Sequence, residues 1–336
     1  MIKPRVGLYA VYEPPEEGWH DYPIQLEQLA AELSAEGLEA CPAPEPVRDP
    51  ASCERVAAWL VAQNLDLLYV LIASWSFDHY SLHIQQATRL SLAVRSVPGI
   101  RSGSIVGGQQ LQSVLYDLGV EHRLFYGSPG DRQIARQFAV YARACALRKR
   151  LIGAKIAVIG RRTEGMTPTA VDEIEILRLF GVRLLNYGLD EFQTLAGQVD
   201  IKEAQAEWER IRAEAKAVTS RPEHGVASIR NLLALRRMGR DLNLQAISIG
   251  SYPQCQGTMC LPIALLNEEG MPTGCEGDVN STLAMYLLSQ LSGAPVHFGE
   301  MLALDFEQNS IVASHCGCGS PSLADEGGFS LLPVRL

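Results

Sequence analysis

The sequence lacks the patterns that mark membrane, secreted and nucleic-acid-binding proteins. None of its apolar runs approaches the length of a membrane span, and the N-terminal residues begin a strand pattern without the apolar core of a signal peptide. The formal net charge of −9 excludes a general binder of phosphate backbones, which needs a clustered basic surface. We therefore expect a cytoplasmic protein with no membrane or nucleic-acid partner.

The common nucleotide-binding and disulfide signatures are missing as well. Neither G-x-G-x-x-G nor a Walker lysine is present, so Gly107-Gly108 predicts a plain turn before a helix over residues 111–118. The eight cysteines form no secreted-type framework in a chain of 336 residues, which favours reduced thiols.

The chain does contain a regular alternation of apolar strand patterns and helical patterns. Residues 6–12, 38–43 and 66–73 are short apolar runs separated by apolar side chains at helical spacing. A long helix over residues 131–152 precedes a new strand at residues 154–160. This order predicts an α/β fold of successive doubly wound, Rossmann-like parallel-sheet domains, covering residues 1–153 and 154–336.

Two loops that follow predicted strands carry candidate substrate contacts. Parallel sheets bind ligands beyond the carboxyl ends of their strands. Trp75 and His79 follow the strand at residues 66–73, and Cys255 and Gln256 follow the strand at residues 244–250. These four residues are therefore predicted to contact substrate. The alternative for Trp75 and His79 is an aromatic cluster that packs its loop onto the next helix.

Two carboxylates and one histidine form the candidate metal site. Glu276 lies among small residues before a helix, Glu300 ends a strand-like run, and His315 follows the strand at residues 310–314. Oxygen and imidazole ligands suit divalent ions, and three of them leave open positions for substrate oxygens. The C-terminal portion, residues 245–320, is therefore expected to bear a metal. Asp278 is expected to cap the following helix and is also a candidate substrate contact.

Sulfur chemistry offers two competing interpretations of the same region. A cysteine nucleophile would pair Cys316 with His315, but neighbouring residues on a strand point to opposite faces, which argues against that pair. A structural zinc site would use several thiols, although their spacing departs from paired C-x-x-C knuckles. The candidates for that zinc site are Cys255, Cys260, Cys275, Cys316 and Cys318.

The C-terminal motifs resemble those of the L-fucose/L-arabinose isomerase superfamily. The resemblance rests on residues 275–279 (CEGDV), on Glu300 after Phe298-Gly299, on residues 315–317 (HCG) and on residues 267–273 (NEEGMPT). It covers roughly residues 245–320, and the N-terminal half is similar only in its alternating α/β architecture.

The resemblance implies an aldose–ketose isomerase that uses Mn²⁺ or another divalent ion such as Co²⁺ or Mg²⁺. Glu276, Glu300 and His315 would be the metal ligands, and the two glutamates would act as base and acid of an enediol mechanism, in an order left open. It also implies a sugar substrate and a homo-oligomer, trimeric or hexameric. The alternative is a non-catalytic sugar-binding or regulatory protein on the same scaffold.

Overall fold

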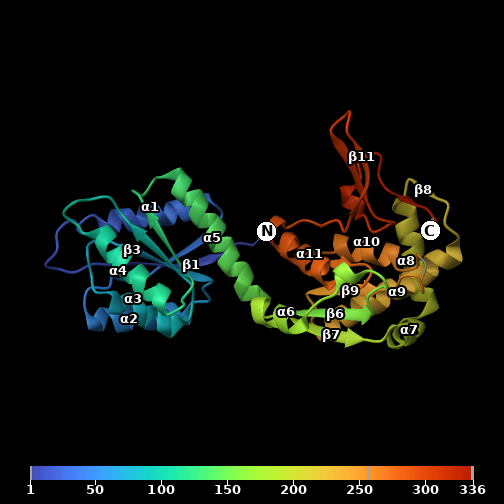
Figure 1. Ribbon diagram of the computed structural model, residues 1–336, viewed down its shortest axis with the longest axis horizontal. Helices are drawn as coiled ribbons and strands as arrows, with labels where there is room; N and C mark the ends of the chain where they lie inside the picture. Colours follow the sequence, from blue (N-terminus) through green and yellow to red (C-terminus); the bar gives the residue numbers. More distant parts are fainter. Residues whose placement is uncertain (1, 256, 334–336) are drawn as a thin grey trace. The chain divides into compact units, whose positions relative to one another are not determined.

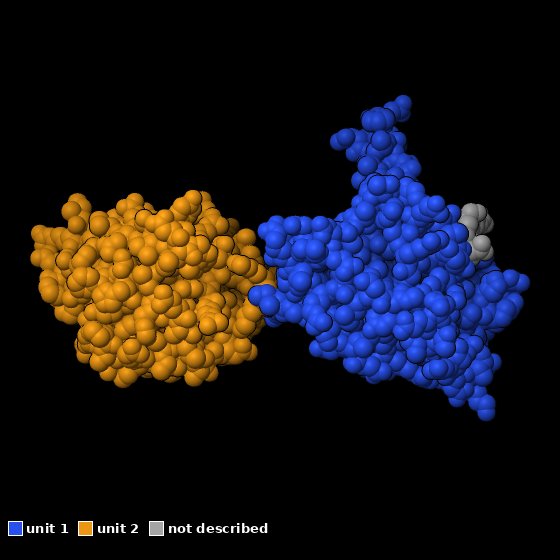
Figure 2. All heavy atoms as spheres, turned by 60° about the horizontal axis from the view of Figure 1, so that its bottom comes forward, with its two compact units in different colours: residues 1, 150–336 blue, residues 2–149 orange. Residues whose placement is uncertain are grey.

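The computed structural model describes residues 2–255 and 257–333. The chain divides into two compact units, an N-terminal unit of residues 2–149 and a C-terminal unit that begins at Arg150 (Figure 2). Each unit is built around its own parallel sheet with helices (Figure 1). The prediction of an α/β fold with parallel sheets is therefore confirmed.

The N-terminal unit contains a five-stranded parallel sheet with the strand order β2-β1-β3-β4-β5. The order reverses between β1 and β3, and such a reversal is the point where open α/β sheets leave a crevice for ligands. Its elements are β1 (Arg5–Val11), α1 (Tyr22–Ala35), β2 (Glu39–Pro42), α2 (Pro50–Ala62), β3 (Leu67–Ile72), α3 (Asp78–Thr88), β4 (Leu92–Ser96), α4 (Ser104–Asp117), β5 (His122–Tyr126) and α5 (Arg132–Leu151).

Strand β3 shows why an unbroken apolar run becomes the centre of this sheet. All six of its residues are buried, and successive side chains point to opposite faces. Leu67, Tyr69 and Leu71 pack with α1 and α5 on one face. Leu68, Val70 and Ile72 pack with α2, α3 and α4 on the other. Helices therefore cover both faces, as the strand–helix alternation predicts.

The predicted turn at Gly107-Gly108 is wrong, because both glycines lie inside helix α4. A Cβ added at Gly108 would meet the Ser96 hydroxyl at 2.2 Å, and one at Gly107 would come within 3.2 Å of Ile72. The glycines thus allow α4 to lie directly on the sheet, a packing role that outweighs their low helix propensity.

The C-terminal unit contains a four-stranded parallel sheet with the order β10-β9-β6-β7. Two further strand pairs, β11–β12 and β13–β8, lie outside that sheet. The helices and strands are β6 (Lys155–Gly160), α6 (Glu173–Phe180), β7 (Arg183–Tyr187), α7 (Leu189–Gly197), α8 (Ile201–Glu214), β8 (Ala217–Val218), α9 (Pro222–Leu242), β9 (Ala246–Gly250), α10 (Cys260–Glu268), β10 (Thr273–Gly274), α11 (Val279–Ser292), β11 (Glu300–Asp305), β12 (Ser310–Ser314) and β13 (Ser330–Leu331).

Strands β11 and β12 form an antiparallel hairpin that stands out from the C-terminal unit (Figures 1 and 2). All six residues of β11 are exposed. The hairpin begins at Glu300 and ends one residue before His315, so its two ends carry two of the three candidate metal ligands. Of the helices described, none combines the length and the apolar character that crossing a membrane requires.

Candidate metal centre

Glu276 lies in a tight turn between β10 and α11. Its backbone is in the left-handed region, with a φ of +62°, which is uncommon for a residue with a side chain. The turn is held by two backbone hydrogen bonds, from Gly277 N to Ile249 O at 3.0 Å and from Thr163 N to Glu276 O at 3.3 Å. A Cβ at Gly277 would lie 2.9 Å from Arg162 backbone atoms, so only glycine fits there. The strained residue is therefore fixed by its neighbours, as at many functional sites.

Glu300 and His315 are brought together by the register of the hairpin. Glu300 opens β11 and pairs with Ser314, the last residue of β12 and the neighbour of His315. The imidazole of His315 also packs edge-on against Phe298, with ring centroids 5.0 Å apart. Glu300 and His315 thus become neighbours because the two strands pair at the open end of the hairpin.

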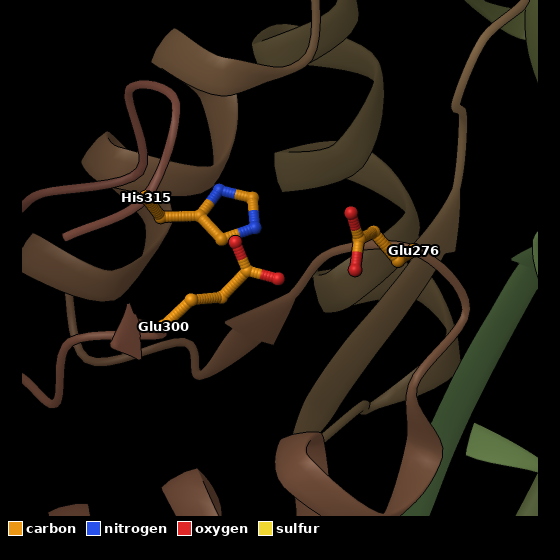
Figure 3. A group of neighbouring side chains, drawn as sticks. All are labelled: Glu276, Glu300 and His315. Carbon is orange, nitrogen blue, oxygen red and sulfur yellow. The ribbon is translucent and has the colours of Figure 1, made fainter. Parts of the chain in front are cut away.

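The three side chains point toward one another (Figure 3). One ligand atom each from Glu276, Glu300 and His315 can be chosen so that all three lie within 4.8 Å of one another. Nε2 of His315 is buried and has no hydrogen-bond partner among the described residues. A buried imidazole nitrogen beside two carboxylates is a donor set that a divalent ion would satisfy. The residues therefore fit the metal that the sequence predicts.

Burial and charge shift the acid–base equilibria of this group. Burial raises the pKa of the Glu276 carboxyl, and the nearby carboxylates of Glu300 and Asp278 raise it further. Burial lowers the pKa of His315, and the charge of Glu300 opposes that shift. Both dominant effects favour the neutral forms, because a charge loses solvation when it is buried. A bound cation would reverse this preference for the carboxyl groups.

The interpretation of Asp278 as a helix cap is confirmed. Its carboxylate accepts hydrogen bonds from Ser281 N at 2.9 Å and from the Ser281 hydroxyl at 2.7 Å, at the start of α11. We expect Asp278→Ala to lower the free energy of unfolding by about 1 kcal/mol, because the helix loses a cap. Urea denaturation checks this value. An unchanged stability together with a raised KM would instead favour a substrate contact.

The other predicted substrate contacts are distributed over the chain. Trp75 and His79 belong to the N-terminal unit, where Trp75 Nε1 donates to Gln110 Oε1 at 3.2 Å and the His79 ring packs 4.2 Å from the Tyr80 ring. Cys255 receives a hydrogen bond from Gln193 at 3.8 Å, and Gln256 lies outside the described residues. The aromatic packing of the alternative interpretation is present, while the roles in substrate binding stay predictions.

The sulfur interpretations need one correction. Cys316 Sγ lies 3.4 Å from His315 Nδ1, so the expectation that these two side chains point apart is wrong. The reason is that β12 ends at Ser314, and the alternation of a strand does not extend to residues 315 and 316. The second sulfur interpretation was a structural zinc site made of thiols. Within the described ranges, one group of three potential metal ligands is found, and it consists of Glu276, Glu300 and His315. The thiols form no comparable group there.

His297 is a further residue near the candidate metal centre, and the sequence patterns did not indicate it. His297 is half-buried, and Nδ1 of its ring has no hydrogen-bond partner in the part of the chain described. Burial lowers the pKa of His297, and the charge of His315 lowers it further. Its position three residues before Glu300 is the one sequence feature that could have indicated a place at this site. Its closeness to His315 is seen only in the folded structure.

Comparison with known proteins links the chain to sugar isomerases. No family model matches it. Sulfoquinovose isomerases of Alkalicoccus urumqiensis and Priestia aryabhattai are 26% and 27% identical to it, over 68% and 67% of this chain and 52% of each relative. An L-arabinose isomerase of a Nocardioides species is 28% identical over 28% of this chain and 18% of that protein. The chain thus spans about half the length of the sulfoquinovose isomerases. These relatives support a relationship to sugar isomerases of the fucose/arabinose type.

Proposed function

We propose that this chain is an aldose–ketose isomerase whose site is formed by Glu276, Glu300 and His315 around a divalent ion, Mn²⁺, Co²⁺ or Mg²⁺. The observation that carries the proposal is the convergence of these side chains in a chain similar to sugar isomerases. Such an ion, when bound, polarises the carbonyl oxygen of a sugar and the hydroxyl oxygen on the adjacent carbon. It thereby acidifies the C–H bond of the carbon that bears the hydroxyl.

The two glutamates supply the proton transfers that the isomerisation requires. A proton leaves carbon 2 of the aldose and another is added at carbon 1, with an enediol between the two steps. One carboxylate removes the first proton, and the other serves the oxygens or the neighbouring carbon. A raised pKa suits Glu276 to either role, because a general acid or base works best when its pKa approaches the working pH.

The direct test incubates the full chain with Mn²⁺ and a panel of aldoses that includes 6-deoxy and sulfonated sugars. Ketose formation is followed by proton NMR, and bound metal is measured by elemental analysis. We expect one or more aldoses to be converted and metal to bind in stoichiometric amount. Absence of ketose from every sugar, together with absence of bound metal, would contradict the proposal. A bound sugar that is never converted would favour a non-catalytic sugar-binding protein.

An anionic sugar is the substrate class to test first. Two of the relatives are named as isomerases of sulfoquinovose, a sulfonated sugar. In this chain Arg161 and Arg162 follow the carboxyl end of β6, and both are exposed. The backbone of Arg162 packs against Gly277, the residue after Glu276. We therefore propose that this arginine pair attracts the charged group of the substrate.

A charge-removing variant of Arg162 separates this role from catalysis. A hydrogen bond to a charged group contributes about 1.5–3 kcal/mol, so we expect Arg162→Met to raise KM for a sulfonated sugar roughly 10- to 100-fold. The value of kcat, and KM for a neutral sugar, should change little. Arg240→Met, which removes an exposed arginine on α9, is the matched control. Equal losses for charged and neutral sugars would rule out the role.

The exposed hairpin supports the proposal of a homo-oligomer. An isolated two-stranded hairpin is marginally stable in water, and a contiguous exposed apolar patch marks an interaction surface. The hairpin exposes half or more of six apolar side chains, those of Met301, Leu302, Leu304, Phe306, Ile311 and Val312. We propose that a second copy of the chain covers this apolar surface of the hairpin.

We expect Phe306→Ser combined with Ile311→Ser to convert the oligomer to a smaller species. These substitutions replace two of the six exposed apolar side chains of the hairpin, including the most exposed one, without touching the cores of either unit. Light scattering after size-exclusion chromatography measures the molar mass, and circular dichroism verifies the fold. Ile174→Ser, at an exposed apolar residue on α6, is the control that should leave the molar mass unchanged. An unchanged mass in the double variant would contradict the prediction.

A further inference from the structure

Four thiols lie beside the candidate metal centre. Cys260 opens α10, Cys316 follows His315, Cys318 is fully buried, and Cys275 precedes Glu276. The Sγ atoms of Cys260 and Cys316 are 3.8 Å apart although 56 residues separate them in the sequence. All four are free thiols in this structure. This contact thus joins a residue of α10 to the neighbour of a predicted metal ligand.

We propose that Cys260 and Cys316 form a reversible disulfide when the protein meets a peroxide, and that this bond weakens metal binding through His315. The effect on metal binding rests on the proposed function, whereas formation of the bond does not. The inference follows from the distance between the two sulfurs and from the contact of one of them with the imidazole.

The geometry requires only a small movement. Sulfur atoms in a disulfide are about 2.05 Å apart, so the two thiols must approach by roughly 2 Å. Cys316 is exposed and lies on the irregular segment after β12, next to Gly317. This segment belongs to no strand or helix. Cys260, by contrast, is fixed at the first turn of α10 and is buried.

The reaction is balanced with the peroxide as the oxidant. The thiolate of Cys260 attacks one oxygen of hydrogen peroxide and the O–O bond breaks. The leaving hydroxide takes up the proton that the thiol had released, so a sulfenic acid and water are produced. The thiol of Cys316 then attacks the sulfenic sulfur, the S–S bond forms, and a second water leaves with the hydroxyl oxygen. Hydrogen bonds from the Cys318 and Cys316 thiols lower the pKa of Cys260 to about 7, which supports its role as the first thiolate.

The consequence for the metal centre follows from the contact between Cys316 and His315. Cys316 Sγ lies 3.4 Å from Nδ1 of His315, while Nε2 of the same ring has no partner among the residues described. A ligating imidazole is oriented by the group that holds its other nitrogen. Drawing the sulfur toward Cys260 removes that partner and the orientation it provides. Loss of such a partner lowers metal affinity by about 10- to 100-fold.

The test treats the reduced full chain with hydrogen peroxide and maps the products by mass spectrometry without reduction. We expect peptides containing Cys260 and Cys316 to be linked, and dithiothreitol to separate them. The apparent Kd for Mn²⁺, measured by calorimetry, should rise about 10- to 100-fold on oxidation and recover on reduction. Cys260→Ser and Cys316→Ser should each abolish the link, and Cys260→Ser, which leaves the thiol beside His315 in place, should keep its Mn²⁺ affinity after peroxide. Cys53→Ser, a buried thiol of the N-terminal unit, should behave as wild type.

The outcomes separate this inference from the proposed function. A link from Cys260 to Cys318, or peroxide products without any link, would overturn the assignment of the pair. A Cys260–Cys316 link with unchanged Mn²⁺ affinity would overturn its effect on the metal. If the reduced protein binds no Mn²⁺ at all, the metal-dependent function fails, and the peptide map still decides whether the disulfide forms.

Discussion

Glu276→Gln should abolish most of the isomerase activity while leaving the fold intact. The amide keeps the size of the side chain but cannot carry a proton between carbon atoms. General acid–base catalysis contributes about 10²- to 10⁴-fold, and the variant also loses a charged metal ligand, so we expect kcat/KM to fall by at least about 10³-fold. Steady-state kinetics with the best aldose, at saturating Mn²⁺, measure the effect.

The same substitution should raise or preserve the thermal stability of the metal-free protein. Burial and the carboxylates of Glu300 and Asp278 raise the pKa of Glu276 in the folded state. A carboxyl whose pKa is raised by folding contributes stability below its unfolded pKa, and that contribution is lost as the pH rises through the folded pKa. At neutral pH the ionised side chain therefore opposes folding, and a neutral amide removes that cost.

The control for Glu276→Gln is Glu269→Gln, on the same unit. Glu269 is paired with Arg236 on the surface, so its loss should affect neither turnover nor metal binding. If Glu276→Gln keeps kcat/KM within about threefold of the wild type, Glu276 is not the base or the acid. A melting temperature that falls together with activity would instead point to a structural role.

The secondary structure that can be predicted from this sequence is the part set by local patterns. Strand β3 is a continuous apolar run, β9 is an apolar run interrupted by Ser248, and α11 follows a capping aspartate and ends before Gly293. None of the predicted strands covers β4, and Arg95 interrupts the apolar run of that strand. In the fold this arginine is fully buried and donates from Nη2 to Ser128 O at 2.6 Å. A partner 33 residues away is not visible in a local pattern.

For the candidate metal site too, the residues can be predicted from the sequence, but their closeness in space cannot. The residue types point to Glu276, Glu300 and His315, and Glu276 and His315 follow strands, since loops beyond strand ends carry functional groups. The expectation that Glu300 ends a strand-like run is wrong, because β11 begins at Glu300. The closeness of Glu300 to His315, however, depends on the register of the hairpin, and the left-handed backbone of Glu276 depends on Gly277 packing against Arg162. The first depends on the pairing of two consecutive strands and the second on a contact between segments distant in sequence, and periodicity and spacing encode neither.

His315→Ala should remove most of the affinity for Mn²⁺, because it deletes one of three ligands. Loss of a group that merely orients a ligand costs up to about 100-fold in affinity, so we expect loss of the ligand itself to cost at least that much. A ligand at 100 times its Kd stabilises the folded protein by about 2.7 kcal/mol. At an Mn²⁺ concentration that gives the wild type this stabilisation, the variant should show less than about 0.5 kcal/mol, measured by thermal denaturation with and without the ion.

The pH dependence of Mn²⁺ binding also tests whether Glu276 and His315 are metal ligands, because protons compete with the ion for them. Metal ions bind the deprotonated ligands, so binding weakens as the pH falls through each ligand's pKa. Burial lowers the pKa of His315, so its imidazole stays neutral and able to bind metal to a lower pH than usual. Burial raises the pKa of Glu276, so that carboxyl takes up a proton at a higher pH than usual. Affinity should therefore decline in acid as Glu276 takes up a proton, and Glu276→Gln should weaken this decline. His224→Ala, at an exposed histidine on α9, should leave both the affinity and its pH profile unchanged. If His315→Ala binds Mn²⁺ as tightly as the wild type, the imidazole does not ligate the ion.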